Sequence, residues 1–306
     1  MADAADDLKF DRSVAAPVGE LIRVSPLVRR MIAPNPGPFT FTGTCTYVVG
    51  NGRVALIDPG PDSEQHVAAL LATLSGETIT HVVVTHTHRD HSPAARAIRA
   101  ATGARIVGCA RHVPVQDAPS GRLDASHDLD HAPDVEMRDG DVMSGDGFSL
   151  EAVATPGHAS NHLCFALPEE NALFSGDHVM GWSTSVVSPP DGNMAAYMAS
   201  LDKLRARSEA IYWPGHGNPV REPERFVRGL ATHRRQRETS ILQRIAAGDE
   251  TIVAIVERIY VGLDPRLKGG AGLSVLAHLE DLVARGAVTS SDGAATLTAQ
   301  YRIGSV

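Results

Sequence analysis

The sequence predicts an α/β fold for the larger, N-terminal part of the chain. Short apolar runs alternate there with stretches whose apolar residues recur at helical spacing. Such alternation of strands and helices is typical of an α/β core. The length of 306 residues is long for one domain and sufficient for a main domain with a small second one. With 43% hydrophobic and 21% charged residues, the composition is that of an ordinary globular protein.

The first elements follow one another in a regular order. An apolar run closes in the turn Asp58-Pro59-Gly60-Pro61, which ends a strand. Further along, Ser92 and Pro93 are typical of an N-cap and a first helical position, and Gly103 ends that helix. The predicted elements are a strand over 54–57, a helix over 63–74, a strand over 79–85, a helix over 93–102 and a strand over 105–108.

Three later apolar runs share one feature, a small-residue turn followed by a side chain that can bind metal. Residues 116–147, which precede these three runs, are rich in Asp, Pro, Gly and His, so we expect a loop with little regular structure there. Glycine in the turns lets the backbone approach a ligand closely. The runs 150–155, 172–174 and 210–213 lead into Pro156-Gly157-His158, Ser175-Gly176-Asp177 and Pro214-Gly215-His216.

The character of the chain changes at about Pro223, and we divide it into domains over 1–222 and 223–306. Three helices followed by a small β-ribbon is the order of a winged-helix domain. The predicted helices cover 224–247, 251–260 and 273–285, and the predicted strands cover 288–289 and 295–301.

Composition excludes several classes of protein. No stretch approaches the roughly 18 apolar residues of a membrane span. The acidic start of the chain is unlike a secretory signal, so we expect a cytoplasmic protein without a membrane partner. Cys45, Cys109 and Cys164 are widely spaced and form no C-x-x-C pair, which predicts buried thiols rather than zinc ligands. Residues 1–220 carry a net charge of −10, which argues against nonspecific nucleic-acid binding without excluding a local basic groove.

The segment Thr85-His86-Thr87-His88-Arg89-Asp90-His91 is the most informative part of the sequence. It places three imidazoles and a carboxylate directly after an apolar strand. Neutral imidazole suits Zn, Fe, Ni or Cu, and a carboxylate compensates charge. Together with the strand ends that carry His158, Asp177 and His216, this segment predicts a metal site at one edge of a sheet.

These motifs resemble the ligand set of the metallo-β-lactamase superfamily over roughly residues 20–220. The resemblance implies an αββα sandwich and two divalent ions, with zinc expected and iron or manganese as alternatives. Two such ions lower the pKa of water to about 7, which implies hydrolysis by a metal-bridging hydroxide. By motif position, the first ion would be bound by His86, His88 and His158, the second by Asp90, His91 and His216, and both by Asp177.

Asp177 stands where antibiotic-hydrolysing relatives typically have cysteine, which makes antibiotic hydrolysis an unfavoured function. The added C-terminal domain resembles that of the β-lactamase-like-protein-2 group, whose best-known members are endoribonucleases acting on single-stranded RNA. The resemblance therefore implies an RNA substrate, or alternatively a small ester, thioester or lactone, as for hydroxyacylglutathione hydrolases. A winged-helix regulator with a metal-binding domain is the alternative outside the enzymes.

Other residues are candidates for supporting or direct roles. Asp90, besides its ligand role, and His178 are the candidate catalytic residues; His178 could donate to a developing oxyanion or only support the site. His162 could support the site by a hydrogen bond, and Asp58 is expected to orient ligand histidines. Tyr197 could line the pocket or pack its helix.

Two groups of polar residues are expected on the surface. His112, His127, His131 and His233 are predicted to lie in solvent. Arg228, Arg234, Arg235 and Arg237 could form a basic patch beside the site, although interleaved glutamates favour a solvated helix face. We expect the C-terminal domain to shape the substrate entrance or to form a homodimer contact.

Overall fold

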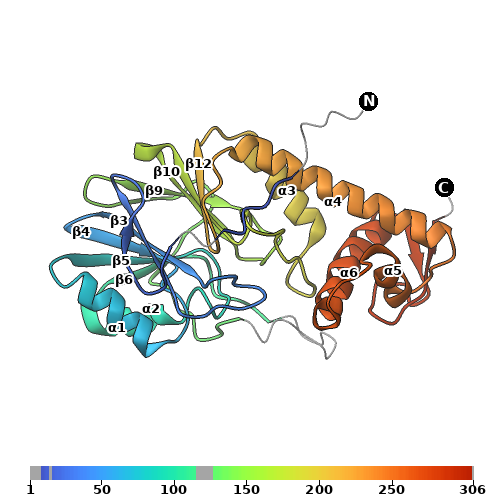
Figure 1. The fold of residues 1–306 in the computed structure, drawn as a ribbon, viewed down its shortest axis with the longest axis horizontal. Coiled ribbons are helices and arrows are strands. Elements are labelled where there is room, and N and C mark those ends of the chain that lie inside the picture. The colour runs from blue at the N-terminus through green and yellow to red at the C-terminus, as the bar shows by residue number, and fades with distance from the viewer. Residues whose placement is uncertain (1–7, 14–15, 115–126, 305–306) are drawn as a thin grey trace.

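Two β-sheets packed face to face form the N-terminal part of the molecule, and a lobe made mostly of helices follows it (Figure 1). The computed structural model describes residues 8–13, 16–114 and 127–304. Within these residues, no helix is both long and apolar enough to cross a membrane. Cys45, Cys109 and Cys164 are buried free thiols, as predicted.

The first sheet runs in simple chain order. Its early strands pair antiparallel, whereas β4, β5, β6 and β7 are parallel, so their carboxyl ends share one edge. The strands are β1 (Ile22–Arg23), β2 (Val28–Ile32), β3 (Cys45–Asn51), β4 (Arg53–Ile57), β5 (Thr78–Val84), β6 (Arg105–Gly108) and β7 (Val135–Glu136).

The second sheet has the order β12-β11-β10-β9-β8. The parallel pairing of β11 with β12 places their carboxyl ends together as well. The strands are β8 (Val142–Ser144), β9 (Ser149–Ala154), β10 (Leu163–Leu167), β11 (Ala172–Gly176) and β12 (Ile211–Pro214), and the 3₁₀ turn η3 (Pro168–Glu170) joins β10 to β11.

Helices cover the outer faces of both sheets. α1 (Glu64–Thr73) and α2 (Ala94–Thr102) lie on the first sheet, where α2 contacts β5 and β6. α3 (Met194–Arg205) packs against the second sheet, with Tyr197 and Leu201 in one apolar cluster with strand residues such as Leu173. The arrangement is the predicted αββα sandwich.

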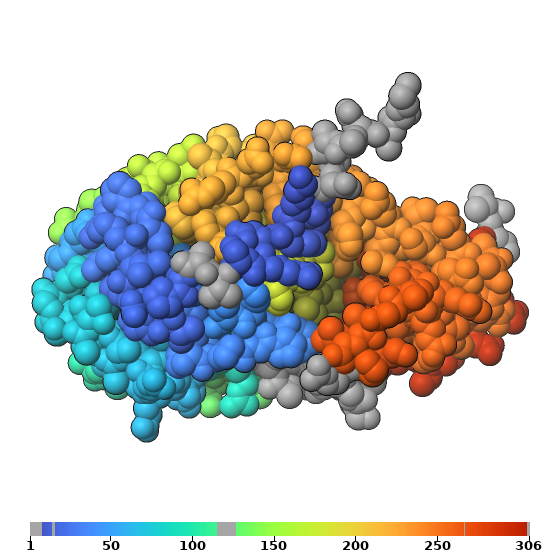
Figure 2. Space-filling model, in the orientation of Figure 1, coloured from blue at the N-terminus to red at the C-terminus, as the bar shows by residue number. Residues whose placement is uncertain are grey.

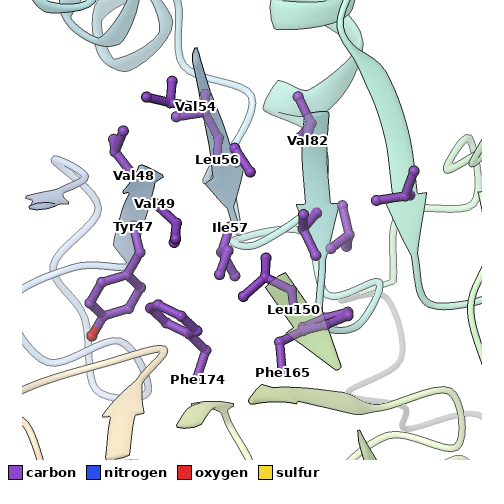
Figure 3. Close-up of a cluster of buried hydrophobic side chains, with 14 of the residues drawn as sticks. Tyr47, Val48, Val49, Val54, Leu56, Ile57, Val82, Leu150, Phe165 and Phe174 are labelled. Atoms are coloured by element: carbon purple, nitrogen blue, oxygen red, sulfur yellow. The ribbon is translucent and has the colours of Figure 1, made fainter. Parts of the chain in front are cut away.

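Alternating strand residues separate the two sides of the second sheet. Phe165 and Phe174 face the first sheet, where Phe174 lies 5.2 Å from the Tyr47 ring (Figure 3). Their neighbours Cys164 and Leu173 face α3 instead. Side chains that alternate in direction along the strands thus bury both faces of the sheet. Functional side chains are therefore left to the ends of the strands.

The C-terminal lobe contains α4 (Pro223–Ala246), α5 (Ile252–Ile259), α6 (Lys268–Ala284), β13 (Val288–Ser290) and β14 (Tyr301–Ile303), with the 3₁₀ turn η4 (Pro265–Leu267) before α6. This is the predicted order of three helices and a β-ribbon. Its own apolar cluster includes Ile255, Leu279 and Tyr301. α4 begins at the predicted division of the chain, and the two domain ranges stay a prediction.

The space-filling view shows how the N-terminal residues join the two parts. Their blue segment lies across the body next to the orange α4 (Figure 2). Phe10 contacts Phe226 of α4 edge-to-face, with the ring centroids 6.0 Å apart, and the backbone N–H of Asp11 donates to the carbonyl of Gly181.

The described part of residues 116–147 contains the short strands β7 and β8, which agrees with the expected loop of little regular structure, while residues 115–126 lie outside the described part. Three predicted helix or strand ends were wrong. Ser92 does not cap α2, because its hydroxyl donates to Asp128 instead, at 2.9 Å. α6 begins at Lys268 rather than 273, and the last strand starts only at Tyr301.

Candidate metal centre

Four strand ends bring the predicted ligands to one edge of the two sheets. β5 leads into His86, His88, Asp90 and His91, while β9, β11 and β12 lead into His158, Asp177 and His216. We refer to these seven residues as the metal centre. The distances between their nitrogen and oxygen atoms divide the metal centre into two halves.

Three imidazoles form the first half of the metal centre. The Nδ1 atom of His88 lies 3.0 Å from Nε2 of His86 and 3.0 Å from Nε2 of His158. The His86 and His158 ring planes are inclined to that of His88 by 79° and 88°. Three ring nitrogens therefore converge on one small space from different directions, as the ligands of a tetrahedral ion do.

The second half combines two imidazoles with carboxylates. Nε2 of His216 lies 3.3 Å from Nε2 of His91 and 3.1 Å from Oδ2 of Asp90. Asp177 faces both halves, since its Oδ1 is 3.5 Å from His91 while its Oδ2 is 3.4 Å from His216 and 3.7 Å from His158. Its position suits a carboxylate shared between two ions.

Each of four histidines has its far ring nitrogen occupied by a polar partner. Nδ1 of His91 contacts Asp58 at 2.9 Å, Nδ1 of His158 contacts the carbonyl of Val186 at 2.6 Å, Nδ1 of His86 contacts the Thr85 hydroxyl at 2.9 Å, and Nδ1 of His216 contacts the carbonyl of Gly43 at 3.3 Å. Such partners fix the tautomer and leave the near nitrogen free to bind metal. This pattern is the main observation that the residues fit a pair of ions.

Two glycines are required for the convergence. A Cβ atom on Gly215 would lie 2.4 Å from Oδ1 of Asp177 and 2.7 Å from Cε1 of His91. A Cβ atom on Gly176 would lie 2.6 Å from Nε2 of His162, and φ at Gly176 is +48°. Glycine lets the backbone pass between the ligands without this clash.

The electrostatics differ between the two halves. Burial lowers the pKa of His86 and His88 well below the ordinary value, and neighbouring imidazoles add to that effect. Burial also lowers the pKa of His216, but Asp177 and Asp90 outweigh it and raise the value to about 10. The first half thus presents neutral nitrogens, while protons in the second half would be released when a cation replaces them.

The predicted supporting residues lie in contact with the metal centre. Asp58 accepts from the backbone and hydroxyl of Thr85 at 2.9 and 2.8 Å, besides its contact with His91. Nε2 of His162 accepts from the backbone N–H of Asp177 at 3.2 Å. Both geometries agree with the sequence prediction.

His178 lies apart from the metal centre. Its ring is fully buried against Tyr197, with ring centroids 4.5 Å apart, and it does not line the pocket described below. Burial lowers its pKa to about 3, and His158 and Arg234 add to that effect. A catalytic role for His178 stays a prediction, and its position favours a supporting one. Tyr197 likewise packs its helix rather than lining the pocket.

The prediction that His112, His127 and His131 lie in solvent was wrong. They are 5%, 4% and 2% exposed, and His233 is half-buried. His112 and His127 stack in parallel, 3.7 Å apart, beside Asp191, a residue for which no role was predicted. Their contacts lie far apart in the chain, so no local pattern could have identified them. We refer to these three residues as the His112–His127–Asp191 cluster.

The arginines of α4 do not form a basic patch. Arg234 is buried, Arg235 lies 3.8 Å from Asp202, and the Arg237 guanidinium lies over the Tyr260 ring. Arg228 lies 3.7 Å from Glu224. The exposed arginines of this group therefore match the predicted solvated helix face. The buried Arg234 matches neither that prediction nor the predicted basic patch.

A cavity of about 150 Å³ opens onto the metal centre. Most of its exposed lining is apolar, and Phe39, Met180 and Val186 are among the residues that line it. Among the described residues that line it, none is lysine or arginine. Its lining residues are Phe39, His88, Asp90, His127, His158, Asp177, Met180, Val186, Ser188, Asp191 and Gly192.

Comparison with protein families gives two matches. Residues 39–216 match the model of the Metallo-beta-lactamase superfamily, and residues 251–295 match that of the Beta-lactamase associated winged helix domain. The first match spans the whole metal centre, and the second spans α5, α6 and β13.

Individual proteins are similar along most of the chain. An atrochrysone carboxyl ACP thioesterase of Paecilomyces divaricatus is 34% identical over 79% of this chain and 72% of its own length. A Beta-lactamase-like protein 2 homolog of Caenorhabditis elegans is 31% identical over 78% of both chains.

Two solved structures share the fold. A beta-lactamase domain protein from Burkholderia ambifaria has 21% identity and a TM-score of 0.78 over 98% of both chains. A metallo-beta-lactamase family protein from Thermus thermophilus has 22% identity and a TM-score of 0.74 over 92% of this chain and 100% of its own.

Proposed function

The chain belongs to the metallo-β-lactamase superfamily and is a hydrolase with a C-terminal winged-helix domain; from this premise we propose that it is a dinuclear metal-dependent hydrolase of esters or thioesters with an apolar acyl group. The observation that carries the choice of substrate is the apolar cavity that opens directly onto the metal centre. The names of relatives 30% and 34% identical to this chain include thioesterases, which supports the same class.

We propose the ligand roles that the sequence predicted. His86, His88 and His158 would hold one ion, and Asp90, His91 and His216 the other, with Asp177 between them. The donors are nitrogen and oxygen alone, which suits zinc and also iron or manganese. When bound, two such ions lower the pKa of water and polarise the attacked carbonyl group.

The residues of the chain orient this chemistry. Asp58 and the Val186 carbonyl hold the His91 and His158 rings, so that both Nε2 atoms point to the metal centre. Asp90 and Asp177 line the cavity, so residues that would hold both ions lie where a substrate carbonyl would enter. Phe39, Met180 and Val186 would take the acyl group and exclude water from its apolar part.

Single-stranded RNA is the second candidate substrate. The winged-helix domain favours it, because domains of this class include nucleic-acid readers. The cavity lining and the paired arginines of α4 do not add a cationic surface for phosphates. A homodimer, a cytoplasmic location and zinc as the native ion stay predictions.

A parallel assay tests the proposal. The metal-loaded protein is compared on S-acyl glutathione of increasing acyl length, a homoserine lactone, a nitrophenyl phosphodiester and single-stranded RNA, each with a His88→Ala control. We expect kcat/KM to be highest for acyl substrates and to rise with acyl length, because the cavity is apolar. Cleavage of RNA that depends on His88, without hydrolysis of any acyl substrate, would overturn the ester or thioester assignment.

A further inference from the structure

One wall of the cavity is formed by residues 178–193, which we call the wall segment. Met180, Val186, Ser188 and Asp191 of this segment line the cavity. The segment follows Asp177 directly and leads into α3. It contains no helix or strand over most of its length, so its shape depends on contacts with other parts of the chain.

The wall segment also controls a ligand of the metal centre. The carbonyl of Val186 accepts a hydrogen bond from Nδ1 of His158 at 2.6 Å. Because Nδ1 carries the proton, Nε2 presents its lone pair toward His88 and Asp177. The Ser185–Val186 peptide unit directly precedes the unit that carries this carbonyl, so a shift of the Ser185–Val186 peptide would displace the carbonyl through Val186 and turn or release the His158 ring.

Arg234 of α4 holds the Ser185–Val186 peptide by a hydrogen bond. Its Nη2 atom donates to the carbonyl of Ser185, and its Cζ lies 5.3 Å from the centre of the Tyr197 ring. The hydroxyls of Ser185 and Tyr197 both donate to the carbonyl of His178, at 2.8 and 3.1 Å. The guanidinium thus belongs to a network that fixes both ends of the segment 178–185.

The environment of Arg234 is unusual for a charged residue. It is 4% exposed, and within the described part of the chain no carboxylate lies within 4.0 Å of it. Burial of a charge without an ionic partner costs free energy, and an apolar side chain of similar volume could fill the same space. The adjacent Arg235, by contrast, has a 59% exposed side chain near Asp202.

We propose that Arg234 is a positioning residue of the metal centre, which fixes the Ser185–Val186 peptide and thereby the ring of His158. The C-terminal helix α4 is then part of the support of the metal site. This inference rests on the proposed function, because it takes His158 as a metal ligand. It also explains why a cation is kept in a buried place that offers it no ionic partner among the residues described.

The test compares Arg234→Met with Arg235→Met in the full-length protein. Both remove a guanidinium from neighbouring positions on α4, but only the first removes the hydrogen bond to Ser185. We expect Arg234→Met to weaken the binding of one of the two ions by up to about 10-fold, the lower end of the range for loss of a direct polar partner of a ligand, because Arg234 acts on that partner one residue away. The absorption spectrum of the Co(II)-substituted protein should change as well. Arg235→Met should leave affinity and spectrum unchanged.

Arg234→Lys provides a second variant that keeps the charge. It should fold if Arg234→Met does not, and it should show the same spectral change, because an ammonium group cannot reproduce the planar guanidinium contact. A lower melting temperature with unchanged metal affinity and Co(II) spectrum, in whichever variant folds, would show a purely structural role and overturn the inference. If the unaltered protein binds less than one ion, the proposed function fails instead.

Discussion

The metal centre and the His112–His127–Asp191 cluster lie next to each other and contain the same residue types. The His88 and His127 rings, one from each group, are 4.6 Å apart. Most members of both groups are buried, and both groups bring imidazole nitrogens and carboxylate oxygens within 4.8 Å of one another. Residue type and distance alone do not distinguish them.

Ring orientation does distinguish them. In the metal centre, neighbouring rings such as His88 and His158 are inclined by 88°, whereas His112 and His127 are inclined by 5°. A metal ion must lie near the plane of each ring at about 2.0–2.1 Å from the nitrogen. Two parallel rings 3.7 Å apart cannot both meet that condition. The His112–His127–Asp191 cluster is therefore arranged as a structural clamp.

Asp191 is the centre of that clamp. Its Oδ2 lies 3.3 Å from Nε2 of His127 and accepts from the backbone N–H of Ser160 at 2.9 Å, while its Oδ1 lies 3.6 Å from Nδ1 of His112. It joins the wall segment to the loop after His158 and to the residues after β6. Substitutions in the metal centre are thus expected to reduce metal binding, and substitutions in the His112–His127–Asp191 cluster are expected to reduce stability.

The largest effect is expected from Asp177→Ala. This change removes the carboxylate that faces both halves of the metal centre, so at least one ion should be lost. Hydrolysis should fall by more than roughly 100-fold, beyond the effect of losing an outer partner of a ligand. Metal analysis and steady-state kinetics check this. Retention of two ions by the variant would break the comparison.

A smaller effect is expected from Asp58→Asn. The asparagine keeps the size of the side chain but loses the charge that pairs with Nδ1 of His91. Metal affinity should fall by about 10- to 100-fold, with two ions still bound at saturation. A competition titration with a chromophoric chelator measures it. An unchanged affinity would mean that Asp58 only shapes the turn after β4.

Asp191→Asn should leave the metal stoichiometry unchanged and lower the free energy of unfolding by about 1–3 kcal/mol. The reason is that polar groups of His127 and Ser160 would lose a charged acceptor inside the protein. Metal analysis and denaturant unfolding of the same preparations separate the two outcomes. If the unaltered protein holds three ions and the variant two, the cluster binds metal and the comparison fails.

The smallest effect concerns the pH dependence of that stabilisation. Burial raises the pKa of Asp191, but hydrogen bonds from His127 and Ser160 outweigh it and hold the value below the ordinary 3.8. The charged carboxylate of Asp191 therefore stabilises the folded protein at pH values above the ordinary pKa of 3.8. This stabilisation is lost as the pH falls through the lower pKa of the folded state. The stability difference between the unaltered protein and Asp191→Asn should shrink below about pH 4. Unfolding at several pH values checks it, and a difference that grows in acid would contradict the clamp.

Sequence reasoning was most successful where function follows local chain geometry. His86, His88, Asp90 and His91 follow one apolar strand, and the other predicted ligands follow glycine turns at the ends of three more strands. Parallel strands carry their carboxyl ends to a common edge, so the convergence of these residues could be anticipated. The strand and helix order was predicted for the same reason, since hydrophobic period is a local property.

The tertiary structure alone decided which of the remaining polar residues are buried, and against what. His127 meets Asp191, 64 positions later, and Arg234 meets Ser185, 49 positions earlier. Such pairs are fixed by the packing of the wall segment between α4 and the sheet edge, which leaves no periodic signal in the sequence. The sequence by itself thus determined the superfamily and which His and Asp side chains meet at the sheet edge, because both depend on the residues at the ends of strands. The apolar cavity and the supports behind it depend on long-range contacts that form only in the folded chain.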